Sequence, residues 1–230
     1  QRRSINKKTK SQIVVIKLNY ISNFSDLDPL ENDSSVQIKW VKPGEDLGRP
    51  DAVIIPGSKQ TIKDLQKIHS SGLGDQLKEF AKSGGIIFGI CGGLQMLGES
   101  LEDPLGLEHS SRTTNNKFKG LNLLHIKTTF ESKKILSRKK ATALWPSKSN
   151  ITGFELHHGK TIATDINQIH PLCKERSLGW VDNSNKKLQV AGTYLHGIFE
   201  NDVWRKDWLN QIRQHQGIEL LKNTEEKIIK

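Results

Sequence analysis

The chain is poor in cysteine and lacks any long apolar run. Two cysteines among 230 residues, Cys91 and Cys173, are too few for a disulfide framework, so we expect a protein of the reducing cytoplasm. No apolar run approaches the roughly 18 residues of a membrane-spanning helix. The basic first ten residues lack the apolar core of a secretory signal. We therefore expect no membrane partner.

Motifs for phosphate and metal binding are also missing. The sequence contains no G-x-x-x-x-G-K-[ST], so it has no P-loop for a nucleotide. It contains neither C-x-x-C nor H-E-x-x-H, the spacings that indicate a strong metal site. These absences argue against an ATPase and a metalloenzyme, and we expect no cofactor and no metal bound by this chain.

The net charge of +10 is confined to two short basic segments. Together they account for the whole excess: Arg2, Arg3, Lys7, Lys8 and Lys10 in one, and Lys133, Lys134, Arg138, Lys139 and Lys140 in the other. Neither segment interleaves aromatic side chains with its cations, as a base-stacking surface does. We interpret them as a solvated tail and the solvated face of a helix, and expect no nucleic-acid partner.

Apolar runs alternate with amphipathic segments, as in a doubly wound α/β fold. Continuous β-branched runs predict buried parallel strands, and the patterns between them predict helices. In the first half we expect strands at 13–18, 36–41, 51–55 and 85–90, and helices at 61–69, 74–82 and 92–98. In the second half we expect strands at 121–124, near 128, at 151–157 and at 188–195, and a helix at 203–215. This order predicts one mostly parallel sheet with helices on both faces.

The glycine-rich stretch GGIIFGICGGLQMLG, residues 84–98, holds the first candidate for catalysis. Cys91 lies between a predicted strand and a predicted helix, flanked by Gly89 and Gly93 in a G-x-[nucleophile]-x-G elbow. Such a turn leaves the side chain exposed, and the amino end of the following helix favours a thiolate. A small buried cysteine at a tight junction is the alternative, but the glycine setting favours a nucleophile. Cys173 lacks that setting and is interpreted as structural.

A cysteine nucleophile needs a general base and donors for an oxyanion. His196 follows the apolar run VAGTYL, so we expect it at the carboxyl end of a strand, on the same rim as Cys91. His157 is the second candidate for the same reason. The amides of Gly57, in the loop IIPGSK, and of Gly92 are the predicted oxyanion donors. Together these residues indicate a thiol–histidine hydrolase or transferase.

Six segments, which follow one another over nearly the whole chain, carry a family resemblance. They are ISNFSDLDPL (21–30), DAVIIPGSKQTIKDL (51–65), GICGGLQMLG (89–98), DPLGLE (103–108), GFELHHG (153–159) and GTYLHGIFEND (192–202). In this combination they resemble the glutamine amidotransferase domain of cobyric acid synthase, a class I (triad-type) amidotransferase of cobalamin biosynthesis. The sister enzyme that makes the a,c-diamide usually has a glycine-rich loop ending in Pro-Glu where PGSK stands here.

The resemblance implies a class I, flavodoxin-like fold in which Cys91 is the nucleophile and His196 its acid–base partner. Gln95, one turn into the helix after the cysteine, is similar to the glutamine-contacting residue of the family. Class I enzymes usually carry a glutamate two residues beyond the histidine, where this chain has Ile198. We therefore expect a catalytic dyad rather than a triad. Two other acidic residues are considered as substitutes for the missing glutamate, namely Glu155 and Glu200.

The resemblance also implies a substrate and partners. Glutamine would be hydrolysed through a cysteine thioester, and the ammonia would serve ATP-dependent amidation of adenosylcobyrinic a,c-diamide carboxylates. ATP and Mg²⁺ would be bound by an N-terminal synthetase domain of dethiobiotin-synthetase type, which this sequence lacks. We accordingly expect a fragment, a separate subunit or an incomplete sequence. Its expected parts are a basic linker or disordered arm (1–11), the amidotransferase domain (12–216) and a C-terminal helical tail (217–230).

Two alternatives stay open. The same fold could serve another ammonia consumer, such as an amidotransferase subunit acting on a peptidoglycan lipid precursor, although segments 21–30 and 192–202 fit cobyric acid synthase better. The other alternative is a non-catalytic subunit whose site has degenerated. The presence of Cys91, Gln95 and His196 argues against it.

Overall fold

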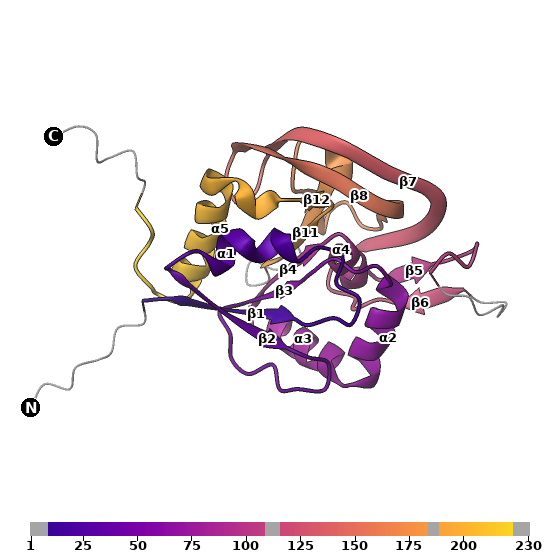
Figure 1. Ribbon diagram of the computed structural model, residues 1–230, viewed down its shortest axis with the longest axis horizontal. Coiled ribbons are helices and arrows are strands. Elements are labelled where there is room, and N and C mark those ends of the chain that lie inside the picture. The colour runs from indigo at the N-terminus through magenta and orange to yellow at the C-terminus, as the bar shows by residue number, and fades with distance from the viewer. Residues whose placement is uncertain (1–8, 109–115, 184–188, 223–230) are drawn as a thin grey trace, which may run out of the picture.

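A seven-stranded sheet forms the centre of the molecule, in the order β2-β1-β3-β4-β11-β10-β9 (Figure 1). The computed structural model describes residues 9–108, 116–183 and 189–222. Five strands are parallel to one another: β1 (Ser11–Ile16), β2 (Val36–Val41), β3 (Ala52–Ile55), β4 (Ile86–Ile90) and β11 (Gln189–Thr193). Two antiparallel strands, β10 (Gly179–Asp182) and β9 (Ile169–Pro171), extend one edge. The predicted mostly parallel sheet is confirmed.

Helices cover both faces of this sheet, as predicted. Consecutive strand residues point to opposite faces. Phe88 of β4 contacts the rings of Trp204 and Trp208 on α5 (Asp202–His215). Its neighbour Gly89 faces the backbone and side chains of α4 (Gly92–Leu97). The remaining helices are α1 (Asp28–Glu31), α2 (Thr61–Ser70) and α3 (Leu73–Lys82), with 3-10 turns η1 (Phe24–Leu27), η2 (Arg176–Leu178) and η3 (Ile198–Glu200).

A second sheet of five strands was not predicted. Its order is β12-β8-β7-β5-β6, and its two long strands arch over the central sheet at the top of Figure 1. The strands are β5 (Ser100–Glu102), β6 (Lys117–Lys119), β7 (Ile126–Ala143), β8 (Ser149–Ala163) and β12 (Leu195–His196).

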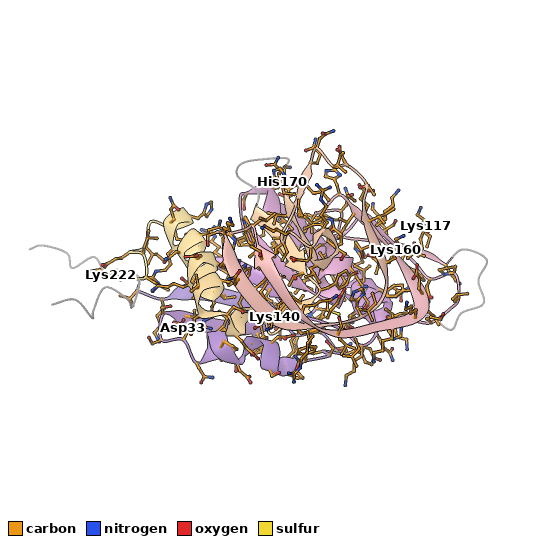
Figure 2. The ribbon with its side chains drawn as sticks, turned by 90° about the horizontal axis from the view of Figure 1, so that it is seen from above. Asp33, Lys117, Lys140, Lys160, His170 and Lys222 are labelled. Carbon is orange, nitrogen blue, oxygen red and sulfur yellow. The ribbon has the colours of Figure 1, made fainter. Side chains whose placement is uncertain are left out.

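The basic segment 133–140 belongs to β7, so its interpretation as a helix face is wrong. Burial along it alternates between exposed and half-buried residues, which is the period of a strand with one face toward solvent. Figure 2 labels the side chain of Lys140 on this strand and that of Lys160 on the neighbouring strand β8. The predicted strand at 121–124 is also wrong, because the backbone amides of these residues bond to carbonyl groups of 96–98 at the end of α4.

The two ends of the predicted domain need smaller corrections. Ser11 already pairs in β1, so the described part of the expected arm is shorter than 1–11, and residues 1–8 lie outside the described chain. Helix α5 ends at His215, and residues 218–222 form no helix, so the predicted helical tail is wrong there. Residues 223–230 lie outside the described chain. Within the described ranges, no helix is long and apolar enough to span a membrane.

Replacing Phe88 by alanine tests the packing between β4 and α5. The ring is fully buried, and it lies 5.5 Å from the Trp204 ring and 5.8 Å from the Trp208 ring. We expect Phe88→Ala to lower the free energy of unfolding by about 3–5 kcal/mol, because it leaves a cavity among aromatic rings. Urea unfolding followed by tryptophan fluorescence measures this. Leu136→Ala is the control, since that side chain is 70% exposed, and an equal loss in both variants would contradict this account of the core.

Candidate active site

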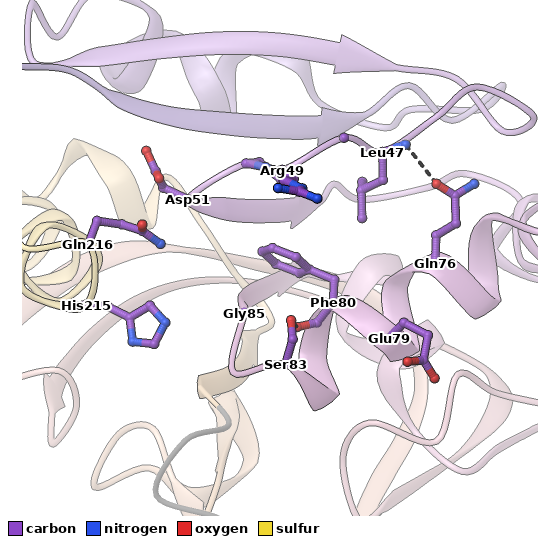
Figure 3. A pocket seen from close by; sticks show the side chains of 12 residues that line it. Leu47, Arg49, Asp51, Gln76, Glu79, Phe80, Ser83, Gly85, His215 and Gln216 are labelled. Carbon is purple, nitrogen blue, oxygen red and sulfur yellow. Dashed lines mark hydrogen bonds between the residues drawn. The ribbon is translucent and has the colours of Figure 1, made fainter. Parts of the chain in front are cut away.

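Four sequence-predicted residues, Cys91, Gln95, His157 and His196, line one cavity of about 480 Å³. Cys91 follows β4, and His196 comes shortly after β11. The cavity is lined by residues from seven segments, among them Ser22, Ser58, Thr61, Cys91, Gln95, Glu108, Phe130, Lys134, Leu156, His157 and His196. A larger cavity of about 600 Å³, shown in Figure 3, lies beside α3 and is lined by Leu47, Arg49, Phe80 and His215. It contains none of the predicted site residues.

Cys91 occupies a strained turn between β4 and α4. Its backbone has φ 51° and ψ −110°. Residues other than glycine rarely adopt a positive φ, so the turn is strained. The neighbouring glycines permit the turn, since a Cβ on Gly93 would lie only 2.0 Å from the carbonyl oxygen of Ile55. The thiol donates a hydrogen bond to the Leu156 carbonyl at 3.2 Å. Cys91 is only 7% exposed, so the expected exposure is wrong: the sulfur lies at the floor of the cavity.

His196 reaches the cavity from the second sheet, not from the strand that precedes it. The predicted strand 188–195 is broken, because β11 ends at Thr193 and the chain crosses to pair as β12 with β8. The Thr193 hydroxyl stabilises the crossing, since it donates to the Leu178 carbonyl and accepts from the Leu195 amide. The imidazole then stacks on Phe154 of β8, with ring centroids 5.0 Å apart.

Asp26 is the third member of the site, and the sequence analysis missed its role. One carboxylate oxygen accepts a hydrogen bond from Nδ1 of His196 at 2.7 Å, and the other accepts from the Gly197 amide at 2.9 Å. Asp26 and His196 are each 2% exposed. The expected dyad is therefore incomplete, because a carboxylate orients the imidazole as in a triad. It comes from the segment ISNFSDLDPL, which the resemblance singled out without a role for this aspartate.

Backbone pairing with the PGSK loop brings Asp26 into place. The Ser22 amide donates to the Gly57 carbonyl at 2.9 Å, and the Lys59 amide donates to the Tyr20 carbonyl at 2.8 Å. Asp64 of α2 supports the same junction, since it accepts from the Ser58 hydroxyl at 2.6 Å. The loop before η1 and the loop after β3 thus form one rigid rim of the cavity.

The imidazole of His196, buried against Asp26, is charged at neutral pH. Burial disfavours the charged imidazole, but the hydrogen bonds and charges of Asp26 and Cys91 outweigh it and raise the pKa of His196 to about 10. His196 is therefore protonated at neutral pH. A protonated imidazole beside the sulfur can pair with a thiolate and can deliver a proton to a leaving group.

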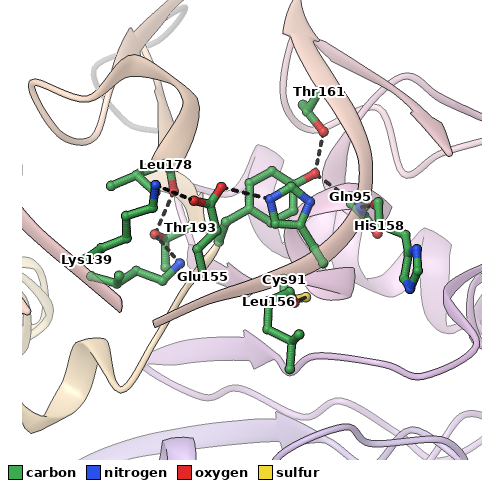
Figure 4. A network of polar contacts seen from close by, with 12 residues as sticks. Cys91, Gln95, Lys139, Glu155, Leu156, His158, Thr161, Leu178 and Thr193 are labelled. Carbon is green, nitrogen blue, oxygen red and sulfur yellow. Dashed lines mark hydrogen bonds and ion pairs between the residues drawn. The ribbon is translucent and has the colours of Figure 1, made fainter. Parts of the chain in front are cut away.

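Neither glutamate considered as a substitute contacts His196. Glu155 accepts from Nε2 of His157 at 2.9 Å and pairs with Lys139 at 2.9 Å, on the far side of β8 (Figure 4). Glu200 is exposed on η3. His157, the second candidate base, therefore has its own carboxylate partner. Neither of the two substitutes that were considered takes the place of the missing glutamate, because Asp26 already occupies Nδ1 of the His196 imidazole.

The remaining predicted residues lie beside the sulfur. A Cβ on Gly57 would lie 3.4 Å from Cε1 of His196 and 3.6 Å from Cβ of Cys91. A Cβ on Gly92 would lie 2.9 Å from the Ser58 amide nitrogen, so the elbow and the PGSK loop touch. Gln95 is buried, and its amide donates to the His158 carbonyl at 3.0 Å and the Tyr194 hydroxyl at 3.1 Å. The oxyanion-hole and glutamine-contact roles stay predictions.

The second cysteine does not line this cavity. Cys173 is fully buried, and burial together with Glu175 raises the pKa of its thiol to about 12. A thiol with that pKa stays protonated at neutral pH and is a poor nucleophile.

Glu108 is a further cavity residue that the sequence analysis did not single out. Burial raises the pKa of its carboxyl to about 7, although the amides of Ile62 and Thr61 oppose the shift. Asp103 accepts hydrogen bonds from the Leu107 and Glu108 amides and thereby holds the segment DPLGLE in place. A carboxyl group at this wall can ionise near neutral pH.

Asp26→Asn tests the origin of the His196 charge. Removing the carboxylate should lower the pKa of His196 from about 10 toward its ordinary value of 6.5, because an opposite charge and a charge-assisted hydrogen bond are lost. An NMR titration of the histidine ring carbons measures the shift. Asp28→Asn, two residues away and exposed, is the matched control. A pKa of His196 that is the same in both variants would contradict the assignment of Asp26.

Comparison with known proteins agrees with this geometry. The family model of the CobB/CobQ-like glutamine amidotransferase domain matches residues 12–204. A cobyric acid synthase of Prochlorococcus marinus is 56% identical over 217 residues, which are 92% of this chain and 43% of that protein. Cobyric acid synthase of Synechococcus sp. (strain WH7803) is 50% identical over 226 residues, or 96% of this chain and 45% of that protein. The chain thus spans less than half the length of these relatives.

Solved structures share the fold at low identity. PurLQS from Thermotoga maritima matches with a TM-score of 0.63 and 15% identity, over 90% of this chain and 99% of that chain. A glutamine amidotransferase structure matches with a TM-score of 0.62 and 14% identity, over 90% and 99% of the two chains. These likenesses confirm the class I amidotransferase fold, and the family match goes further: the chain belongs to the CobB/CobQ-like glutamine amidotransferase domain family, and its curated relatives are cobyric acid synthases.

Proposed function

We propose that this domain hydrolyses glutamine at Cys91 and supplies the ammonia for the amidations of a cobyric acid synthase. The observation that carries the proposal is that Cys91, in its strained turn, and His196 line the same cavity. Asp26 orients the His196 imidazole through a hydrogen bond and helps to raise its pKa. A nucleophile, an acid–base residue and an orienting carboxylate are the parts that acyl transfer from an amide requires.

In the first half-reaction the Cys91 thiolate attacks the side-chain amide carbon of glutamine. The oxyanion that forms is held by the backbone amides of Gly57 and Gly92, whose segments touch beside the sulfur. His196 gives its proton to the departing nitrogen. The carbon–nitrogen bond then breaks, leaving ammonia and a glutamyl thioester.

In the second half-reaction His196, now neutral, accepts a proton from water. The hydroxide attacks the thioester carbon, and the carbon–sulfur bond breaks to release glutamate and the thiolate. The proton remains on His196, which restores the starting ion pair. Asp26 keeps the imidazole in one orientation through both steps, since it bonds both Nδ1 and the next backbone amide.

The cavity carries charges that suit the zwitterionic end of glutamine. The carboxyl of Glu108 lines one wall and can pair with the α-ammonium group, while Lys59 and Lys134 line the same cavity and can pair with the α-carboxylate. Gln95 orders the wall through its bonds to His158 and Tyr194. Its carbonyl oxygen, 3.5 Å from the Thr61 hydroxyl, is the atom that would contact the substrate amide.

The acceptor belongs to the part of the synthase that this chain does not include. The curated relatives are named cobyric acid synthase and are more than twice as long as the matched region. We assign to their additional length the ATP- and Mg²⁺-dependent activation of adenosylcobyrinic a,c-diamide carboxylates, which ammonia then attacks. The reaction is placed in the cytoplasm, where a nucleophilic thiol stays reduced.

Loss of Cys91 or His196 should abolish the release of glutamate from glutamine. Cys91→Ala removes the nucleophile, and His196→Ala removes the proton donor, so each should lower turnover at least about 10³-fold. Glutamate is measured with the domain alone and with an ATP-dependent synthetase domain present. Cys173→Ala should stay within about twofold of the unaltered domain, because its thiol is protonated and does not line the cavity. Undiminished release by Cys91→Ala would refute the proposed nucleophile.

Glu108→Gln tests recognition of the glutamine ammonium group. The loss of a charge-assisted hydrogen bond should raise KM about tenfold or more with a smaller effect on kcat, because the group binds ground state and transition state alike. In the unaltered domain KM should fall as pH rises through about 7, where the carboxyl of Glu108 ionises. Steady-state kinetics between pH 5 and 9 measure both effects. Equal KM values for the two proteins across this range would contradict the proposal that Glu108 binds the ammonium group of glutamine.

A further inference from the structure

A second cavity of about 320 Å³ lies on the other face of β7 and β8. Phe130, Leu156 and His158 line the cavity that contains Cys91, called the glutamine cavity below, whereas their odd-numbered neighbours Glu131, Ile135 and Gly159 line the second one. Lys160, beyond the irregular pairing at Gly159, also lines the second cavity. This alternation places the two cavities on opposite sides of the strands. Among the described residues, His157 is the one that lines both.

The strand pairing is interrupted beside His157. β7 and β8 pair at Thr129 with Lys160 and again at Lys134 with His158, so four residues of β7 stand opposite Gly159 alone. Gly159 has φ 93°, and a Cβ there would lie 2.7 Å from the Thr129 carbonyl oxygen. The regular backbone pairing between β7 and β8 is therefore interrupted opposite Gly159.

Side chains rather than backbone separate the two cavities. The His157 ring stacks on Tyr194 with centroids 3.6 Å apart. The Tyr194 hydroxyl accepts from Gln95, which lines the glutamine cavity, and hydrogen-bonds Thr161, which lines the second cavity (Figure 4). The stacked rings of His157 and Tyr194 thus fill the gap that the interrupted β7–β8 pairing leaves between the two cavities.

His157 presents an unused acceptor at this point. Nε2 donates to Glu155, whose other oxygen pairs with Lys139. Nδ1 is buried and makes no hydrogen bond to a side chain among the described residues, while the backbone of His158 and Gly159 lies close enough to the ring to oppose the lowering of its pKa. Burial lowers the pKa of His157 below its ordinary value, although Glu155 opposes the shift. The ring is thus neutral, and its free nitrogen can accept an N–H without giving up a proton.

Ammonia is the small molecule that this arrangement suits. It is produced at Cys91 in the glutamine cavity, it must remain neutral to attack a carboxyl, and it carries N–H donors for a bare imidazole nitrogen. The opposite arrangement, a protonated histidine, would convert it to ammonium. The remaining walls of the second cavity offer polar groups from Glu131, Lys133, Thr161 and Ser177.

We propose that ammonia leaves the glutamine cavity past His157 and passes through the second cavity on its way to the acceptor. This inference rests on the glutaminase function proposed above. Glu155 and Lys139 are then positioning residues, since they hold the tautomer in which Nδ1 of His157 is the free acceptor.

The test compares two adjacent residues of β7 in the complete ATP-dependent enzyme that contains this domain. Ile135→Trp fills the second cavity, whereas Leu136→Trp adds the same ring at a side chain that is 70% exposed and lines neither cavity. Glutamate and amidated product are measured in the same reaction. We expect Ile135→Trp to lower the ratio of product to glutamate about tenfold with the rate of glutamate release unchanged, and Leu136→Trp to leave the ratio unchanged.

Two further measurements complete the test. Amidation from added ammonium chloride should be unaffected by Ile135→Trp, because external ammonia does not need the route. His157→Phe keeps the ring against Tyr194 but removes the acceptor, and should lower the product-to-glutamate ratio about fivefold, the effect of one hydrogen bond. A ratio that Ile135→Trp and His157→Phe leave unchanged would overturn the route. Absence of Cys91-dependent glutamate release would instead overturn the function on which it rests.

Discussion

The buried hydrogen bond between Asp26 and His196 is the constraint on which the site depends. It joins the 3-10 turn η1, directly after the loop that follows β1, to the short strand β12, which belongs to the second sheet. The same loop also pairs with the PGSK segment after β3. Backbone hydrogen bonds and the Asp26 carboxylate therefore connect the PGSK loop to His196. An imidazole held and charged in this way can serve as acid and base in turn, which is what hydrolysis through a thioester demands.

The two sheets contribute different parts of the site: Cys91 follows a strand of the central sheet, and His196 lies in a strand of the second sheet. The parallel strands bury an apolar core, and their carboxyl ends place Cys91 in its strained turn. β8 then covers the sulfur with the Leu156 carbonyl and stacks Phe154 on the imidazole of His196. Its other face carries His157 and Glu155, so one strand lines the cavity where ammonia forms and the proposed route by which it leaves.

Local patterns predicted the central strands, the turn that holds Cys91 and the presence of His196 in the same cavity, because each is encoded in neighbouring residues. The run GGIIFGICGG is such a case: strand, turn and glycines all lie within it. Asp26 was not predicted, because its role comes from a contact with His196, 170 residues away. β12 was missed for a related reason: VAGTYLH reads as one strand, and only the pairing of Leu195 with Glu155 shows the change of sheet. Segment 133–140 was wrongly interpreted as the face of a helix, because the solvated face of a strand can carry as many basic residues as that of a helix.

The most direct test of this account is reaction of the domain with the diazoketone analogue of glutamine, followed by peptide mass spectrometry. The analogue binds as glutamine and alkylates a nucleophile at the amide position. We expect one adduct per chain, on Cys91, with protection by excess glutamine and no label on Cys173, whose buried thiol has a raised pKa. Labelling of Cys173 in preference to Cys91, or labelling of Cys91 that glutamine does not prevent, would contradict the central claim that this cavity binds glutamine against a cysteine nucleophile.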